Sequence, residues 1–395
     1  MAGRPSGWSV SSGDPRRSHD AVFTALALVC AFAPCAPVLA QGSRHEEIAR
    51  LQAEKAARLH PYREHAGERV LDRVEAFLGA GEGVYPWLGS VYAGGLLGIG
   101  AGYRRTIGDT GVMNALGAWS LRNYKLARLD VKLPELAGRR VAIAPHALWL
   151  DAPAVDFYGT GLDTTREQKT TYAYSPTVAG VNATVRITDW FVLGAGGEAQ
   201  SIETDLAGDD IRYLIARAAA GVDWRSSPGY SRAGGLYRID WAHHDARSGG
   251  PFAFSRIEAE AVQLVPLFRE SSVIALRGLV TTTDTSGGNT VPVFMLPALG
   301  GSNTLRGYPS WRFRDRHRLL LSGEYRWMAS QVIDMALFVD AGTVAPRRGD
   351  LRLRDLKKDV GIGIRLHGPT FTAVRLDLAR SSEGWVINLG GGAAF

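Results

Sequence analysis

Cysteine is nearly absent from this sequence. Its two cysteines, Cys30 and Cys35, both lie within the first 40 residues. The chain beyond residue 40 therefore offers no thiol, no disulfide and no cysteine-based metal site. A lipoprotein signal would place a small residue before its cysteine, but Val29 and Pro34 occupy those positions, so we expect no lipid attachment.

Long apolar runs are missing too. No segment after residue 40 reaches the roughly 18–20 consecutive apolar residues that a membrane-spanning helix needs. The one apolar stretch, Ala21–Ala33, has 13 residues, follows two arginines and precedes the small-residue site Val38-Leu39-Ala40. These are the parts of a secretory signal, so we predict a signal peptide over 1–40, cleaved near Ala40. An uncleaved anchor or a wrongly assigned start codon are the alternatives.

Signals for nucleic-acid or nucleotide binding are also lacking. The formal charge is +6, from 45 Lys and Arg against 39 Asp and Glu, and no basic run of the kind that follows a phosphate backbone is present. The glycines of Gly98–Gly102 punctuate a strand-like segment and do not form a phosphate-binding loop. We therefore predict no nucleic-acid partner and no cofactor.

One compact group of potentially catalytic side chains remains, His243-His244-Asp245. It follows Trp241 at a point where a strand should give way to a loop. No third metal ligand is evident from the spacing. We interpret the group as a loop cluster and predict no metal site and no enzymatic activity.

Alternation of apolar and polar residues dominates the chain from about residue 88 to its end. Five consecutive C-terminal segments each present one apolar face and one polar, charged or small face; in one of them the apolar face holds Leu319, Leu321, Gly323, Tyr325 and Trp327. A soluble sandwich would instead bury a dense apolar set. Segments of this length can cross a bilayer, which needs about 9–11 residues per strand. The pattern favours an all-β, antiparallel transmembrane β-barrel over 86–395, closed because lipid leaves no partner for an open edge.

The strand count is predicted as 14 to 16. Fourteen segments alternate, near 88–103, 110–130, 139–153, 173–188, 189–204, 211–225, 230–245, 253–266, 270–285, 313–329, 333–343, 358–367, 371–380 and 384–395. An even number places both ends of the barrel on one side of the membrane. The count rises to sixteen if two long segments each hide a turn.

The segment 41–85 has a different pattern, typical of helices. The charge pairs Glu46–Arg50 and Glu54–Arg58 have i,i+4 spacing, and a second apolar stripe follows Pro61 before Gly79. We predict a short helical segment that plugs the barrel, lies in the periplasm or binds a partner. A poorly ordered leader is the remaining interpretation.

A long loop separates the segments 270–285 and 313–329. It contains Leu305-Arg306-Gly307-Tyr308 and Arg314-Asp315, followed along the chain by Glu324-Tyr325-Arg326 and Phe338-Val339-Asp340-Ala341-Gly342. Together with the weaker element Phe157-Tyr158-Gly159-Thr160-Gly161, these motifs resemble the bacterial surface antigen family, the BamA/TamA superfamily of outer-membrane assembly and translocation barrels. The resemblance covers roughly 150–395.

The resemblance implies that the loop folds back into the barrel. Its tip, Arg306, Gly307 and Tyr308, would dock on the inner wall, where Glu324 and Asp340 both fall on the predicted lumen face. An arginine can hold two carboxylates, a glycine allows a close backbone turn, and a tyrosine packs as an amphipathic anchor. An exposed arginine in a flexible extracellular loop is the alternative reading of the spacing.

The last strand resembles the C-terminal signal by which outer-membrane barrels are recognised and inserted. Trp385, Leu389 and the final residue, Phe395, fall on alternate positions. The alternative is a strand that merely ends in phenylalanine.

These observations predict an outer-membrane protein of a Gram-negative bacterium. Family members that insert or secrete proteins carry periplasmic POTRA modules, and 41–85 is too short for one. The leading expectation is assembly, insertion or translocation of polypeptide or lipid, with a weak seam between the first and last strands. The alternative is a passive or gated pore or structural barrel. Expected partners are outer-membrane lipid and lipopolysaccharide, the assembly machinery for its own insertion, and a periplasmic or client protein.

Overall fold

The computed structural model describes residues 50, 51, 54, 82–138, 140–207, 210–227, 229–268, 271–368, 371–392 and 395. Two compact units divide at Arg63, and only Arg50, Leu51 and Glu54 of the first are described, all three helical. The predicted signal peptide 1–40 lies outside the described residues, as does most of the predicted helical segment 41–85. Among the residues that are described, no helix is long and apolar enough to cross a membrane.

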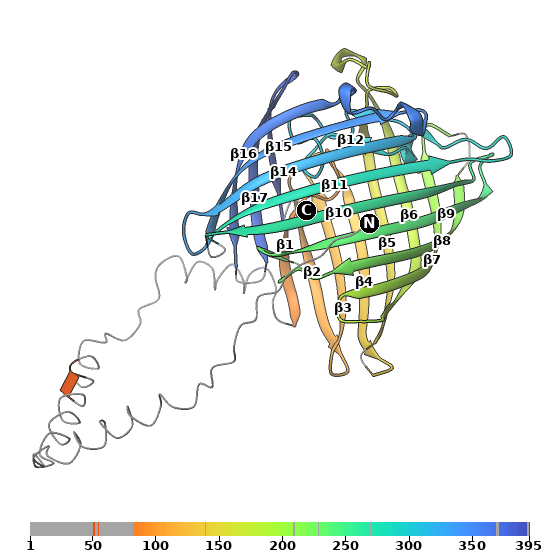
Figure 1. Ribbon diagram of the computed structural model, residues 1–395. Coiled ribbons are helices and arrows are strands. Elements are labelled where there is room, and N and C mark those ends of the chain that lie inside the picture. Colours follow the sequence, from red (N-terminus) through yellow and green to blue (C-terminus); the bar gives the residue numbers. More distant parts are fainter. Residues whose placement is uncertain are drawn as a thin grey trace, which may run out of the picture. The chain divides into compact units, whose positions relative to one another are not determined.

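The second unit is a single antiparallel sheet of 16 strands that curls into a barrel (Figure 1). The strands follow one another in sequence order around it. They are β1 (Gly83–Gly89), β2 (Gly98–Ile107), β3 (Gly111–Ser120), β4 (Lys125–Leu136), β5 (Val141–Phe157), β6 (Thr170–Arg186), β7 (Phe191–Thr204), β8 (Ile211–Asp223), β9 (Gly234–Ser248), β10 (Phe254–Leu267), β11 (Ser272–Asp284), β14 (His317–Met328), β15 (Ile333–Ala345), β16 (Lys357–His367), β17 (Thr372–Ser381) and β18 (Gly384–Gly390).

The fold class and the upper strand count are confirmed. The two long segments near 88–103 and 110–130 each contain a turn, so they form β1 with β2 and β3 with β4. The first turn, at 90–97, includes left-handed Gly94 and Leu96, and the second, at 121–124, includes left-handed Asn123. Both turns carry apolar residues. A search for alternating apolar and polar residues therefore did not distinguish them from the flanking strands.

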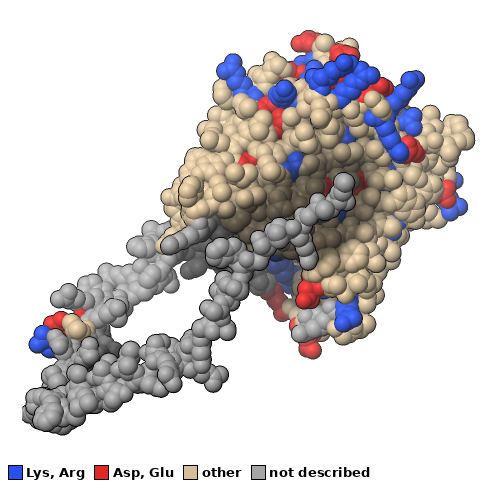
Figure 2. Space-filling model, in the orientation of Figure 1, with Lys and Arg blue, Asp and Glu red and all other residues tan. Residues whose placement is uncertain are grey.

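Alternation places the apolar face of each strand outward. On β15, Leu337 and Val339 are about half exposed, at 49% and 48%. Asp340 on the same strand, which pairs with β14 and β16, faces inward and is fully buried. The same division holds on β16 and β17, where Ile362 and Leu376 face out and Asp377 faces in. Figure 2 shows the result as a broad uncharged band beneath a concentration of Lys and Arg at the upper end of the barrel.

The two ends of the barrel differ in their connections. At the end where β1 begins and β18 ends, the connections are short, apart from 224–233. The opposite end carries the longer connections 158–169, 285–316 and 346–356, with the short 3-10 helices η2 (Arg166–Gln168), η3 (Val293–Met295), η4 (Arg348–Asp350) and η5 (Leu353–Asp355). We call these ends the turn side and the loop side.

The barrel is not closed by strand pairing. β1 pairs with β2 and β18 with β17, and in the described part of the chain neither has a second partner. The predicted strand 384–395 is also too long, because β18 ends at Gly390. Phe395 consequently does not continue the outward apolar row. Its ring lies inside, near the guanidinium groups of Arg277 and Arg326, at 5.8 and 5.1 Å.

Candidate functional site

The long connection 285–316 occupies the loop side of the lumen. It contains η3 and the two-stranded ribbon of β12 (Ala298–Leu299) and β13 (Phe313–Arg314). Leu305, Tyr308 and Phe313 of this connection pack with inward-facing Leu279 and Leu320 of β11 and β14 in one buried cluster. The connection is therefore held by a small core of its own inside the barrel, rather than projecting from it.

Arg306 lies at the tip of this connection and is almost completely buried. Its Nε and Nη2 donate to the two oxygens of Asp340 at 2.7 and 2.8 Å, and its Nη1 donates to Glu324. The guanidinium also lies 3.5 Å from the centre of the Phe338 ring. Burial disfavours the charged form, yet the bond to Asp340 and the neighbouring carboxylates raise the pKa of Arg306 above its ordinary value.

Glu324 is shared by three arginines. Besides Arg306, it accepts from Nε of Arg326 at 2.6 Å and from Nη2 of Arg365 at 2.9 Å. Arg365 also pairs with Asp377 at 3.0 Å. Arg306, Glu324 and Asp340, which we call the loop lock, thus belong to a larger network of inward charges on β14–β17. A buried charge needs such partners, because its desolvation costs several kcal/mol in a low-dielectric site.

Gly307 and Tyr308 fit closely against the last strands. A Cβ on Gly307 would lie 2.5 Å from the Cβ of Asp359 on β16, so the position requires glycine for space rather than for an unusual φ. The Gly307 carbonyl accepts from the Ser381 hydroxyl at 2.7 Å. The Tyr308 hydroxyl lies 3.2 Å from that of Ser382. The structure therefore brings together all five residues expected at the loop tip and its wall.

Several residues of this site were not expected to form it, although Arg326 belongs to a motif named in the sequence. Arg326, Arg365 and Asp377 extend the ion network, and Asn388 on β18 donates to the Arg306 carbonyl at 2.8 Å. The sequence did contain a signal for Arg326, Arg365 and Asp377, because neighbouring strands each carry a charged residue on the predicted lumen face at similar depth. Asn388 gave none, since an isolated asparagine on a strand has many ordinary explanations.

A second set of contacts ties the connection to other loops. Arg312 donates to Glu383 through Nε at 2.9 Å and to the Thr164 hydroxyl at 2.7 Å. Arg314 donates to the Tyr172 hydroxyl at 2.7 Å, and its carbonyl accepts from the Gly161 amide at 2.8 Å. The Phe157–Gly161 element, at the end of β5 and the start of the β5–β6 connection, therefore borders the long connection.

Apolar side chains fill the loop side of the lumen along β5–β10. These strands contribute inward residues that pack with η3; we call the group the apolar cap, and it comprises Tyr172, Tyr174, Ile202, Tyr213, Phe254 and Phe294. The rings of Tyr174 and Phe294 lie 5.8 Å apart, and those of Tyr213 and Phe254 lie 6.1 Å apart. The cap is a buried apolar core between the barrel wall and the long connection.

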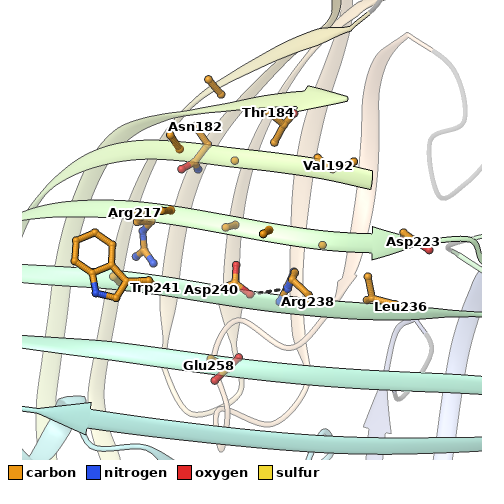
Figure 3. A pocket seen from close by; sticks show the side chains of 18 of the residues that line it. Asn182, Thr184, Val192, Arg217, Asp223, Leu236, Arg238, Asp240, Trp241 and Glu258 are labelled. Atoms are coloured by element: carbon orange, nitrogen blue, oxygen red, sulfur yellow. Dashed lines mark ion pairs between the residues drawn. The ribbon is translucent and has the colours of Figure 1, made fainter. Parts of the chain in front are cut away.

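A cavity of about 720 Å³ lies on strands β6–β10, nearer the turn side. We call it the vestibule. Figure 3 shows the ion pair of Arg238 and Asp240 on β9, between Arg217 on β8 and Glu258 on β10. Arg217 makes a two-pronged bond to Glu198, at 2.8 Å for each oxygen. The vestibule is thus polar, but these charges already have partners.

A second cavity lies between the unpaired edges of β1 and β18. This seam cavity, about 530 Å³, is lined on one side by Leu88 and Leu96 and on the other by Ile387 and Leu389. The connection tip contributes Tyr308 and its two following residues to the inner wall. The seam therefore joins the outward apolar surface to the loop tip.

The other residues considered from sequence lie apart. Trp385 and Leu389 are exposed on the outer face of β18, at 61% and 48%. The histidine pair was wrongly expected in a loop, since it lies within β9. Alternation sends His244 inward against the Phe254 ring, at 4.2 Å, while His243 contacts Ser255 at 2.9 Å. Among the described residues, no group of metal-ligating side chains converges.

Comparison with protein families gives one match: the Omp85 superfamily domain fits residues 155–388, more than half of the chain. The chain belongs to the Omp85 superfamily. The surface-antigen resemblance is confirmed, and the protein is an outer-membrane β-barrel of this superfamily. Because outer-membrane barrels have short periplasmic turns and longer outer loops, the turn side of this Omp85 barrel faces the periplasm and the loop side faces outward.

One solved structure of similar fold supports the architecture. BamA from Haemophilus ducreyi lacking POTRA domains 1–3 is 15% identical, with a TM-score of 0.58, over 78% of this chain and 68% of that one. CdiB from Acinetobacter baumannii is 12% identical, with a TM-score of 0.49, over 79% of this chain and 57% of that one. Comparison with curated proteins found no match.

Proposed function

We propose that this barrel inserts or translocates client polypeptide at the seam between β1 and β18. The observation that carries the proposal is the pair of unpaired edges facing the seam cavity. An exposed strand edge presents unpaired N–H and C=O groups and can accept a further strand. In lipid an edge requires a partner strand more strongly, because no water can satisfy its unpaired N–H and C=O groups.

The loop lock has a defined part in this proposal. Arg306, held by Asp340 and Glu324, keeps the connection inside the barrel, and its carbonyl accepts from Asn388 on the edge strand β18. Gly307 and Tyr308 extend the contact to the β17–β18 hairpin. The loop lock would therefore hold β18 from the lumen side. The outer face of β18 would stay accessible.

Crosslinking the seam tests the proposal. Leu88→Cys and Ile387→Cys place one thiol on each lining of the seam cavity, and a bismaleimide would join the two edges. We expect the joined barrel, in proteoliposomes, to lose assembly of a reporter barrel. The control is Leu378→Cys with Ile387→Cys, which are already opposite each other on β17 and β18. Equal activity of both crosslinked forms would contradict a seam mechanism.

A gated pore is the second candidate, and the vestibule favours it. A polar cavity of about 720 Å³ reaches into the periplasmic half of the lumen. The apolar cap and the long connection occupy the outer half, so conduction would require their displacement. Large, steady unit currents from the purified barrel in planar bilayers, without a partner, would favour the pore over the seam.

The remaining assignments are also proposals. We propose no enzymatic role, signal-peptide cleavage near Ala40, and an insertion signal that includes Trp385, Leu389 and Phe395. The partners proposed are lipopolysaccharide, the machinery that inserts this barrel, and a client or periplasmic protein. Replacing Phe395 by Ala and measuring the yield of folded barrel in cells tests the insertion signal, which a normal yield would overturn.

A further inference from the structure

Two cations stand on the outward face of the barrel. Lys358 begins the outward row of β16, and Arg380 ends that of β17. Val360 is opposite Arg380 in the strand register, so Lys358, two residues from Val360 on the same face, is a diagonal neighbour roughly 7–8 Å from Arg380. Both side chains are exposed. The remaining outward residues of these strands form an aliphatic row, Val360, Ile362, Ile364, Leu366, Val374, Leu376 and Leu378.

The position of this pair is the outer edge of the apolar band. Lys358 is opposite Ala341, and the next outward residues toward the periplasm, Val339 and Val360, are about half exposed. The guanidinium of Arg380 lies 5.4 Å from the ring of Trp385, which is 61% exposed on β18. Tryptophan and long cationic side chains are typical of the membrane interface, where head groups begin.

Neither cation has an acidic partner among the described residues. The nearest acids along the chain, Asp359 and Asp377, are buried on the inner face, and Glu383 is held by Arg312 at 2.8 Å. Asp355 in the next connection lies 3.5 Å from Arg354. Two like charges on neighbouring strands repel each other. The arrangement lacks an anion on the side that faces the bilayer.

The connection 346–356 adds to this charge. It carries Arg347 and Arg352, both exposed and without an ion pair in the described structure, next to Leu353, which is 67% exposed. Figure 2 shows Lys and Arg side chains gathered at this end of the barrel, above the uncharged band. An exposed leucine among cations suits a surface where head groups meet acyl chains.

We propose that Lys358 and Arg380, with Arg352 in the connection that leads into β16, bind the phosphate monoester of a glycolipid head group in the outer leaflet. A phosphate monoester carries about −1.5 to −2 charges at neutral pH, enough to neutralise two cations, whereas a phosphodiester carries only one. The acyl chains of the same molecule would lie on Val360 and Leu376. The site requires only the barrel's place in the outer membrane and does not depend on a seam mechanism.

Lipid retention tests the site. The full-length barrel is placed in phosphatidylcholine nanodiscs containing diphosphoryl lipid A or, separately, phosphatidylglycerol, and bound lipid is counted by native mass spectrometry. We expect lipid A to be retained, and the Lys358→Gln, Arg380→Gln variant to retain roughly tenfold less of it. The charge-preserving variant Lys358→Arg, Arg380→Lys should behave as the wild type.

A second pair of substitutions controls for net charge. Arg105→Gln with Lys132→Gln removes two exposed cations near the periplasmic ends of β2 and β4 and should leave retention unchanged. Heat-modified mobility on gels confirms that each variant is folded. Equal loss in both double variants, or equal retention of phosphatidylglycerol and lipid A, would overturn the proposal. Displacement by inorganic phosphate alone would do so as well, since it would show a site for the free anion.

Discussion

At the scale of single residues, Arg306 does what a lysine could not. Its planar guanidinium bonds both oxygens of Asp340, bonds Glu324 with a third nitrogen, and lays one face on Phe338. A lysine has one ammonium group, which cannot make this flat, forked contact. A glycine at 361 leaves room for the Phe338 ring, which a Cβ there would strike.

Arg306→Ala should strongly destabilise the folded barrel. It leaves Asp340 without its partner, and breaking a buried pair costs about 3–5 kcal/mol, less where water reaches the lumen. The free energy of unfolding in urea, measured in lipid vesicles, checks this. Arg238→Ala is the matched control: its side chain is 44% exposed, so the loss should be below about 1 kcal/mol. Equal losses would show that the buried contacts of Arg306 contribute no more to stability than an exposed ion pair.

Gly307→Ala should displace the connection tip without removing any charge. The new Cβ would come within 2.5 Å of Asp359 on β16, a backbone-near atom that cannot rotate away. We expect faster protease cleavage within 285–316 in the folded barrel. Gly349→Ala, in an open part of another connection, has nothing within 4 Å and should have no effect. Unchanged cleavage of the Gly307 variant would show that the tip has room to spare.

At the scale of elements, alternation in the sequence predicted most strands, because each has one face in lipid and one in the lumen. It failed where turns are apolar, as at 90–97, and where alternation outlasts the strand, as beyond Gly390. The loop tip and its two carboxylates could be predicted because the family motif and the predicted lumen face of the strands indicated the same residues. The contacts of Asn388 and of Arg312 with Glu383 could not, since they depend on which distant loops meet.

The apolar cap makes a prediction at this scale. Phe294 of η3 packs against Tyr174, so Phe294→Ala should open a gap in the cap and raise the unit conductance in planar bilayers. The lost contact also costs up to about 3–5 kcal/mol of stability. Phe268→Ala, in a periplasmic turn and 78% exposed, should change neither quantity. A conductance unaltered by Phe294→Ala would mean that the cap does not limit conduction.

At the scale of the whole molecule, the lumen is divided between a polar periplasmic vestibule and an outer half filled by the long connection and the cap. This closure is made by residues of the barrel unit itself. A chain lacking 41–80 should therefore still show small currents in planar bilayers. Large currents on that deletion would assign the closure to the N-terminal segment instead.

The two borders of the seam are not equivalent. Hydrogen bonds from the long connection reach the β17–β18 hairpin at Asn388, Ser381 and Glu383, whereas on the β1–β2 side the described contacts include one, from Trp311 to the Ala93 carbonyl. Amide hydrogens of β1 should therefore exchange with deuterium sooner than those of β18. Opening would be one-sided, with the N-terminal hairpin swinging away while the C-terminal hairpin remains as a fixed template for the incoming strand.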